Sequence, residues 1–137
     1  MRIKQTARDF CEACDGGKGW EVCRKWCTDD AAFSVQADAL AEITSLAEYT
    51  EWAKGLLTPM PDARAEFKAI AVDEDNNRAV VYAVFLGTHT VDAGSGAPTG
   101  RSVASDYVYV LGFDGPRISH MTKVWNDEHA LRQLGWA

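Results

Sequence analysis

The centre of the sequence is the stretch PTGRSVASDYVYVLGFDGPRISHMTKVWND, residues 98–127. Residues 102–113 are rich in Val and Tyr, which suit a pleated, half-buried surface. Asp114-Gly115 follows, and an Asp-Gly pair between two apolar runs is a strong hairpin signal. Residues 117–125 alternate again, so we predict two long antiparallel strands joined by a tight turn.

Both faces of this predicted hairpin carry apolar side chains. Because side chains alternate along a strand, Tyr107 and Tyr109 share one face of the first strand. The second strand divides into Met121, Lys123 and Trp125 on one face and Ile118, His120, Thr122 and Val124 on the other. We expect helices of the same chain to cover one face and a second subunit to cover the other, which predicts a homodimer.

Composition and charge narrow the class of protein. The 137 residues are 47% hydrophobic and 25% charged, which is typical of one globular domain spanning residues 1–137. The net charge of -6 and the lack of a basic run argue against nucleic acid as a partner. No apolar stretch reaches the roughly 20 residues of a membrane span. The apolar centre of a signal peptide is missing from the N-terminal MRIKQTARDF, so we expect a cytoplasmic protein.

Three helices are predicted before the hairpin. A helical stripe within residues 6–14 consists of Ala7, Phe10, Cys11 and Cys14. A second helix is expected at residues 20–27. The third begins after Thr44 or Ser45, with Glu48 completing a capping box, and ends at the proline-rich residues 58–61.

The remaining segments predict strands at residues 31–37, 63–72 and 78–90 and a final helix at residues 128–134. Helices ahead of a run of strands favour an α+β fold. We expect a curved antiparallel sheet that is packed by the N-terminal helices and forms a cone. The interior of a cone is a natural pocket for a small molecule.

Six short motifs, taken in their order along the chain, carry a resemblance to a known family. They are Thr28-Asp29-Asp30-Ala31, Pro61-Asp62, Gly87-Thr88-His89, Pro98-Thr99-Gly100-Arg101, Phe113-Asp114-Gly115 and Leu131-Arg132-Gln133-Leu134-Gly135. In this order the sequence resembles the SnoaL-like polyketide cyclase family of the NTF2-like superfamily over nearly the whole chain. The resemblance implies an NTF2-like cone, but this scaffold carries cyclases, isomerases, epoxide hydrolases and non-catalytic binding proteins.

The sequence departs from this family at its expected acid–base residues. The resemblance implies a pocket His and Asp in the cyclases, and by strand position these sites fall on Tyr109 and Lys123 here. The segment His120-Met121-Thr122-Lys123 holds no carboxylate where the family has an acidic run. A mechanism in which that Asp removes a proton therefore does not carry over.

Lys123, Tyr107 and Tyr109 form the main candidate site. In a shared pocket, desolvation would lower the pKa of the lysine, and a nearby ammonium would lower the pKa of a tyrosine. A neutral Lys123 would act as a base or form a Schiff base, and Tyr109 would donate to an enolate oxygen. The alternative is a lysine that extends to the pocket rim beside two packing tyrosines.

Two histidines and one aspartate are further candidates. We expect His89, at a strand end beside a long loop, to be a third catalytic residue at the pocket mouth; strand-end capping is the alternative. His120 faces away from Lys123 in the predicted register. A bulge would bring it into the pocket as a ligand-binding residue, and otherwise it lies at a subunit interface. Asp106 interrupts an apolar strand face, and a buried carboxylate needs a charged partner, for which Arg101 and Lys123 are the candidates. The alternative is an ion pair at an interface or at the edge of the sheet.

Apolar side chains supply the expected walls of the pocket. Besides His120, the predicted ligand-binding residues are Phe33, Phe85, Tyr107, Met121 and Trp125. Such walls imply a small hydrophobic ligand as the partner. We expect no cofactor and no catalytic metal.

The four cysteines, Cys11, Cys14, Cys23 and Cys27, lie in the first two predicted helices. Three interpretations compete. The cysteines are free thiols in the core, or they form two disulfides that pair Cys14 with Cys23 and Cys11 with Cys27, or they bind a zinc ion as its four ligands. The spacing leaves all three interpretations open.

Two functions fit these observations best. The first is a SnoaL-like enzyme that performs acid–base chemistry on a hydrophobic carbonyl or polyketide-like compound. The second is a non-catalytic binding module for a small apolar ligand. A third, an interaction protein using the outer face of the sheet, remains open. The Lys–Tyr cluster favours the enzyme, whereas the missing carboxylates favour the binding module.

Overall fold

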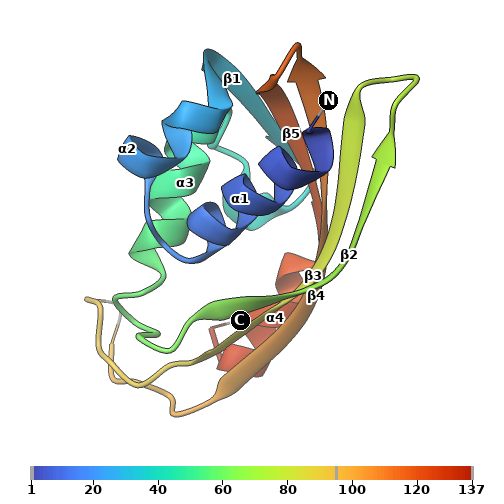
Figure 1. Cartoon of the computed structure of the whole chain (residues 1–137). Coiled ribbons are helices and arrows are strands. Elements are labelled where there is room, and N and C mark those ends of the chain that lie inside the picture. Colours follow the sequence, from blue (N-terminus) through green and yellow to red (C-terminus); the bar gives the residue numbers. More distant parts are fainter. Residues whose placement is uncertain (1, 95, 137) are drawn as a thin grey trace.

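Helices α1, α2 and α3 lie on the concave side of a curved five-stranded sheet (Figure 1). The structure is a computed structural model, and it describes residues 2–94 and 96–136. The helices are α1 (Ile3–Asp15), α2 (Trp20–Cys23), α3 (Leu46–Gly55) and α4 (Asp127–Leu134). The strands are β1 (Cys27–Val35), β2 (Arg64–Asp73), β3 (Arg78–Thr88), β4 (Ser102–Asp114) and β5 (Arg117–Trp125). This arrangement confirms the predicted α+β cone.

The sheet order is β1-β5-β4-β3-β2, with antiparallel pairing from β2 to β5. At the other edge β1 pairs with β5 in parallel, so the sheet is mixed rather than wholly antiparallel as predicted. The cause is the connection through α3, which carries the chain from β1 at one edge to β2 at the opposite edge. A connection of that length does not fix strand direction as a hairpin does.

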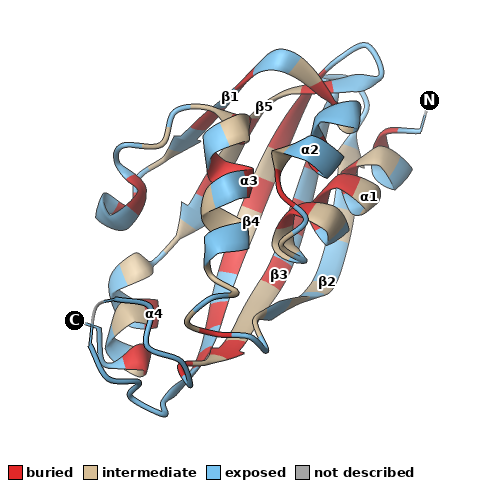
Figure 2. Cartoon of the chain, turned by 90° about the vertical axis from the view of Figure 1, so that its left-hand side faces the viewer, coloured by how far each residue is buried: buried red, intermediate tan, exposed pale blue. Residues whose placement is uncertain are grey.

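The concave face holds the core, as Figure 2 shows by the buried residues of β3 and β4 behind the helices. The stripe predicted on the first helix is confirmed, because Ala7, Phe10, Cys11 and Cys14 of α1 are all buried. The capping box of α3 is also confirmed. Ser45 Oγ accepts from the Glu48 N–H at 3.1 Å, and Glu48 Oε1 accepts from the Ser45 N–H at 3.2 Å.

The second predicted helix is shorter than expected. α2 ends at Cys23 and is followed by a single 3₁₀ turn, Arg24–Trp26, after which β1 begins at Cys27. The strand thus starts four residues earlier than predicted. Within the described part of the chain, no helix is long and apolar enough to cross a membrane.

A bulge in β5 corrects the predicted faces of this strand. Phe113 pairs with Ile118 and Gly112 pairs with His120, so Ser119 is an extra residue on β5. Ile118 consequently lies on the concave side and is fully buried, instead of sharing a face with His120. Beyond the bulge the predicted alternation holds, and Met121 and Lys123 are both buried.

Candidate active site

A cavity of about 190 Å³ lies between the concave face of the sheet and helices α3 and α4. Its wall is mostly apolar and consists of Ala39, Trp52, Ala53, Leu56, Leu57, Met60, Ala63, Phe85, Val103, Trp125, Ala130, Leu131, Leu134 and Trp136. An apolar cavity of about 150 Å³ is enough to hold benzene. The volume here therefore suits a compound of one or two rings.

One end of the cavity is polar and contains Asp15, Tyr49, Tyr107, Tyr109 and Lys123. Lys123 Nζ donates to the Tyr49 hydroxyl at 3.0 Å, and the Tyr49 and Tyr109 hydroxyls are 2.6 Å apart. The Tyr109 hydroxyl donates to Asp15 Oδ1 at 2.7 Å, and the Tyr107 hydroxyl donates to Asp15 Oδ2. A continuous hydrogen-bonded chain thus connects the lysine to the carboxylate.

Lys123 is 6% exposed and is enclosed by aromatic rings. Its Nζ lies 4.2 Å from the ring centroid of Trp125, and the centroids of Tyr107, Tyr49, Trp52 and Tyr109 follow at 5.1, 5.2, 5.2 and 6.0 Å. Burial lowers the pKa of Lys123 to about 8, although the charge of Asp15 opposes this shift. Half of the amine is therefore neutral at about pH 8, and a smaller share is neutral at pH 7.

Asp15 and Tyr49 are the two polar residues of this end of the cavity that the sequence analysis did not single out. Burial raises the pKa of the Asp15 carboxyl group, while the hydrogen bonds from Tyr107 and Tyr109 and the charge of Lys123 act in the opposite direction. Burial and the Asp15 charge raise the pKa values of both tyrosines, so these hydroxyls stay protonated and donate to the carboxylate. A carboxylate with a raised pKa suits a general base near neutral pH.

The end of α1 sets the position of Asp15. The helix stops there, and Gly17 follows with φ of 74° against the side chain of Leu57. A β carbon at Gly17 would overlap Leu57, so the turn needs glycine for both its conformation and its close approach to the residues that follow α3. Asp15 also lies four residues after Cys11 on the buried stripe, and a carboxylate at a helix C-terminus opposes the helix dipole. These two features were the available sequence signals.

Five of the residues singled out from the sequence line the cavity: Phe85, Tyr107, Tyr109, Lys123 and Trp125. Two others are buried outside it. Phe33 stacks on the Tyr49 ring with centroids 4.4 Å apart, and Met121 lies in the core of the sheet. The prediction that they line the pocket was therefore wrong, because alternation along a strand identifies a face of the sheet and not the part of that face left open.

His89 lies behind the wall of the cavity and not at its mouth. The ring is 2% exposed, and Nδ1 accepts hydrogen bonds from the Thr99 N–H and from Trp136 Nε1, each at 3.1 Å. Because both donors occupy the Nδ1 lone pair, this nitrogen is not free to take a proton from a ligand. The geometry assigns His89 a supporting contact with Trp136, which does line the cavity.

His120 and Asp106 lie on the convex face of the sheet. The His120 ring covers Gly112, and its Nε2 is 3.2 Å from Nη1 of Arg78. Partial burial and the Arg78 charge lower the pKa of His120. Asp106 Oδ1 accepts from the Tyr82 hydroxyl at 3.3 Å and has neither Arg101 nor Lys123 as its partner. The bulge exists, but it precedes His120 and leaves the histidine outside the pocket.

All four cysteines are free thiols buried in the core, the first of the three interpretations. Burial and the neighbouring Asp15 charge raise the pKa of Cys11, and burial raises the pKa of Cys27 to about 12. Within residues 2–94 and 96–136, no three His, Cys, Asp or Glu side chains are grouped as metal ligands.

Comparison with known proteins identifies the family. The model of the SnoaL-like polyketide cyclases matches residues 5–134, and the chain belongs to this family. No protein of curated function matches the sequence. Membership agrees with the cone and its cavity.

Several solved structures share the fold. IdmH from Streptomyces antibioticus, provisionally assigned as a polyketide cyclase, is 20% identical with a TM-score of 0.79, over 98% of this chain and 99% of that chain. A provisionally assigned polyketide cyclase from Acidithiobacillus ferrooxidans is 19% identical with a TM-score of 0.76, over 100% and 96%. A ketosteroid isomerase-like protein from Catenulispora acidiphila in complex with trimethylamine is 16% identical with a TM-score of 0.67, over 92% and 89%.

Proposed function

We propose that the protein is an enzyme that performs acid–base chemistry on a small hydrophobic carbonyl compound. The observation that carries this proposal is the chain from Asp15 through Tyr109 and Tyr49 to Lys123 at the polar end of an apolar cavity. The apolar wall holds the rings of the substrate, and its carbonyl group faces the polar end. The cavity volume favours substrates with one or two rings.

Each polar residue has a role in this reaction. Asp15 removes a proton from the carbon next to the carbonyl group, and Lys123 with Tyr109 activates the carbonyl group itself. The product of this step is an enolate or its equivalent, from which a new carbon–carbon bond or a shifted double bond forms. The polyketide cyclase assignments of the solved neighbours support this class of chemistry.

Proton exchange tests the proposal without knowledge of the natural substrate. Indanone and acetophenone are ketones with one or two rings, and NMR in deuterated water reports the loss of their α protons. We expect the protein to accelerate this exchange and Asp15→Asn to slow it by about 10²- to 10⁴-fold, as for loss of a general base. The rate should rise with pH as the Asp15 carboxyl group, whose pKa is raised, loses its proton.

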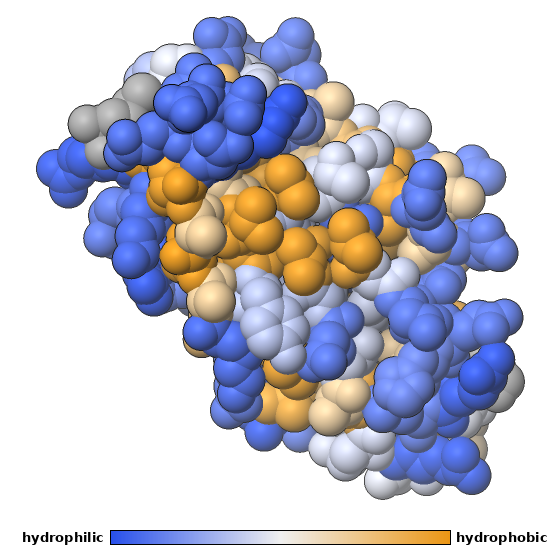
Figure 3. Space-filling view, turned by 90° about the vertical axis from the view of Figure 1, so that its right-hand side faces the viewer, coloured by the Kyte–Doolittle hydropathy of each residue, from blue (hydrophilic) through white to orange (hydrophobic). Residues whose placement is uncertain are grey.

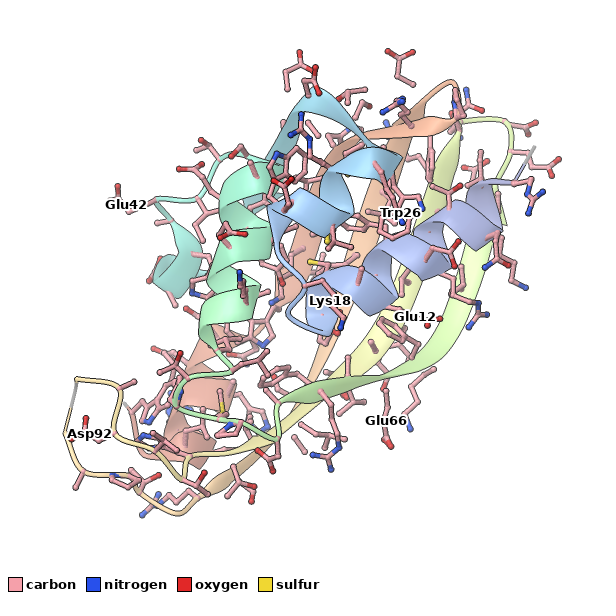
Figure 4. The ribbon with its side chains drawn as sticks, turned by 60° about the vertical axis from the view of Figure 1, so that its left-hand side comes forward. Glu12, Lys18, Trp26, Glu42, Glu66 and Asp92 are labelled. Atoms are coloured by element: carbon pink, nitrogen blue, oxygen red, sulfur yellow. The ribbon has the colours of Figure 1, made fainter. Side chains whose placement is uncertain are left out.

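Glu12→Gln is the matched control for this variant. Glu12 lies one turn earlier on α1 and is exposed (Figure 4), so its loss should leave exchange unchanged. An Asp15→Asn variant that exchanges protons as fast as the natural chain would contradict the role of Asp15.

A binding module is the second candidate. Both Asp15 oxygens accept hydrogen bonds from tyrosines. A pocket that only binds its ligand would have the same arrangement, and this observation favours the binding module. Binding of indanone without any accelerated exchange would support this function over the enzyme.

We also propose that the chain forms a homodimer through the convex face of the sheet. Val80, Tyr82, Val108, Val110 and Val124 form a convex patch, and Val124 is 60% exposed. Figure 3 shows an apolar area on this face of the molecule. Asp106 of β4 pairs with Val84 of β3, which lies six residues after Arg78 on the same strand. At about 3.3 Å per residue, Arg78 and Asp106 are therefore about 20 Å apart along the sheet. A two-fold axis that lies in the interface and runs perpendicular to the strands would place each Arg78 opposite the acidic end of the second copy, which argues for a second copy as the occupant.

A further inference from the structure

The protein offers few oxygen acceptors to the amine of Lys123. An ammonium group carries three N–H donors, and the structure provides one oxygen acceptor, the Tyr49 hydroxyl. The ion pairs found among the described residues are at the surface, and none includes Lys123. Aromatic faces supply the other contacts of Nζ. Aromatic faces accommodate a neutral amine as well as a cation. The cost of burying an unpaired charge then favours the neutral amine.

The hydrogen-bonded chain gives the proton of this amine a destination. Tyr109 donates its single proton to Asp15, so the proton between the two tyrosines belongs to Tyr49. Tyr49 in turn accepts from Lys123. All donors therefore point from the lysine toward the carboxylate. Passage of one proton along the chain leaves a neutral amine and a protonated Asp15, with no change in the net charge of the buried site.

We propose that Lys123 is a Schiff-base nucleophile for aldehydes and ketones of one or two rings. This rests on the proposed function, since it takes the same site and substrate class, and it specifies how the carbonyl group is activated. The lone pair of neutral Nζ attacks the carbonyl carbon, and one Nζ proton passes to the carbonyl oxygen to give a carbinolamine. Protonated Asp15 then gives its proton to this hydroxyl group, which leaves as water while the C=N⁺H bond forms, and Asp15 is left as a carboxylate.

The iminium ion makes the next step easier. Its positive nitrogen draws electrons from the neighbouring C–H bond, and Asp15 takes that proton to give an enamine. After the carbon–carbon or proton-transfer step, water adds to the iminium carbon and releases the carbonyl product and the ammonium form of Lys123, whose proton returns along the hydrogen-bonded chain to Asp15. No oxidant, reductant or metal is needed for this cycle.

Reductive trapping tests the proposal on the natural chain. The protein is incubated with benzaldehyde, acetophenone or indanone and sodium cyanoborohydride, which adds hydride to an iminium carbon. Intact-mass measurement should show one adduct, with the mass of the carbonyl compound less one oxygen atom, and peptide mapping should place it on Lys123. At about pH 7.5 we expect Lys123 to react at least about tenfold faster than Lys54, an exposed lysine of α3.

The rate at Lys123 should rise through about pH 8, where its amine loses its proton. The titratable groups facing it are Asp15, Cys14, Tyr49, Tyr107 and Tyr109, and the cysteine and tyrosines have pKa values raised by their surroundings. They stay protonated in this range. Lys123→Met should lose the site-specific adduct and keep the slow reaction of the exposed lysines.

The outcomes separate this inference from the proposed function. Adducts on exposed lysines alone, with all three probes, would overturn the role of Lys123. Accelerated α-proton exchange together with no Lys123 adduct would leave the proposed acid–base function standing and refute the covalent step. A Lys123 adduct without accelerated exchange would support the nucleophile and refute the acid–base function.

Discussion

At the scale of the residue, the buried amine of Lys123 makes folding stability depend on pH. Its pKa of about 8 in the folded chain lies below the ordinary lysine value. Between these two values the unfolded chain binds more protons than the folded chain, so the stability of the folded state rises with pH. Below about pH 8 the cost of burying the ammonium ion is fully present.

Lys123→Met removes this dependence and supplies the first stability prediction. The natural chain should gain about 2 kcal/mol of unfolding free energy relative to the variant between about pH 7.5 and about pH 10. Urea denaturation at several pH values measures it, and groups that titrate in both proteins cancel in the difference. Lys54→Met, at an exposed lysine, should show no such trend. A pH-independent difference for Lys123→Met would mean that the buried lysine keeps its ordinary pKa.

At the scale of the element, the bulge of β5 depends on a close contact across the convex face. The His120 ring lies on Gly112, where a β carbon would overlap it, and the same ring lies 3.2 Å from the Arg78 guanidinium. Glycine is needed here for space and not for backbone conformation, because its φ is not positive. The small residue lets the histidine ring lie flat against the sheet.

Gly112→Ala should therefore destabilise the chain by about 1–3 kcal/mol, because the His120 ring must leave its contact with Arg78. In a His120→Ala background the same substitution should be neutral or stabilising, since alanine costs less conformational entropy than glycine in a strand. Chemical denaturation of the two single variants and the double variant gives the coupling energy. Additive effects would show that the ring does not occupy the space above Gly112.

At the scale of the whole molecule, the convex patch governs the proposed assembly. Asp106→Arg places like charges opposite each other across the proposed two-fold axis, and we expect it to raise the dimer dissociation constant at least about tenfold. Adding Arg78→Asp to this variant reverses both charges and should restore the dimer. Size-exclusion chromatography with light scattering over a dilution series measures both effects.

Asp92→Arg is the control for this experiment. Asp92 lies in an exposed loop after β3, away from the convex patch (Figure 4), and should leave the dimer unchanged. A natural chain that stays monomeric at the highest concentration would refute the proposed assembly, and the catalytic proposal would stand independently.

The sequence by itself determined the features that depend on neighbouring residues. The Asp114-Gly115 hairpin, the Ser45–Glu48 capping box and the buried stripe of α1 each follow from local turn chemistry or from side-chain period. Alternation along β5 likewise placed Lys123 on the concave face, because it lies beyond the bulge. The order of the short motifs indicated the family.

Only the tertiary structure decided which distant groups meet. Asp15 and Tyr109 are 94 residues apart in the sequence, yet they share a hydrogen bond because α1 ends against the middle of β4. The extra residue Ser119 moved Ile118 into the core, and the approach of Trp136 turned His89 from a candidate base into a support of the wall. Local patterns fix the conformation of a segment, but register shifts and contacts between segments are set by the packing of the whole chain.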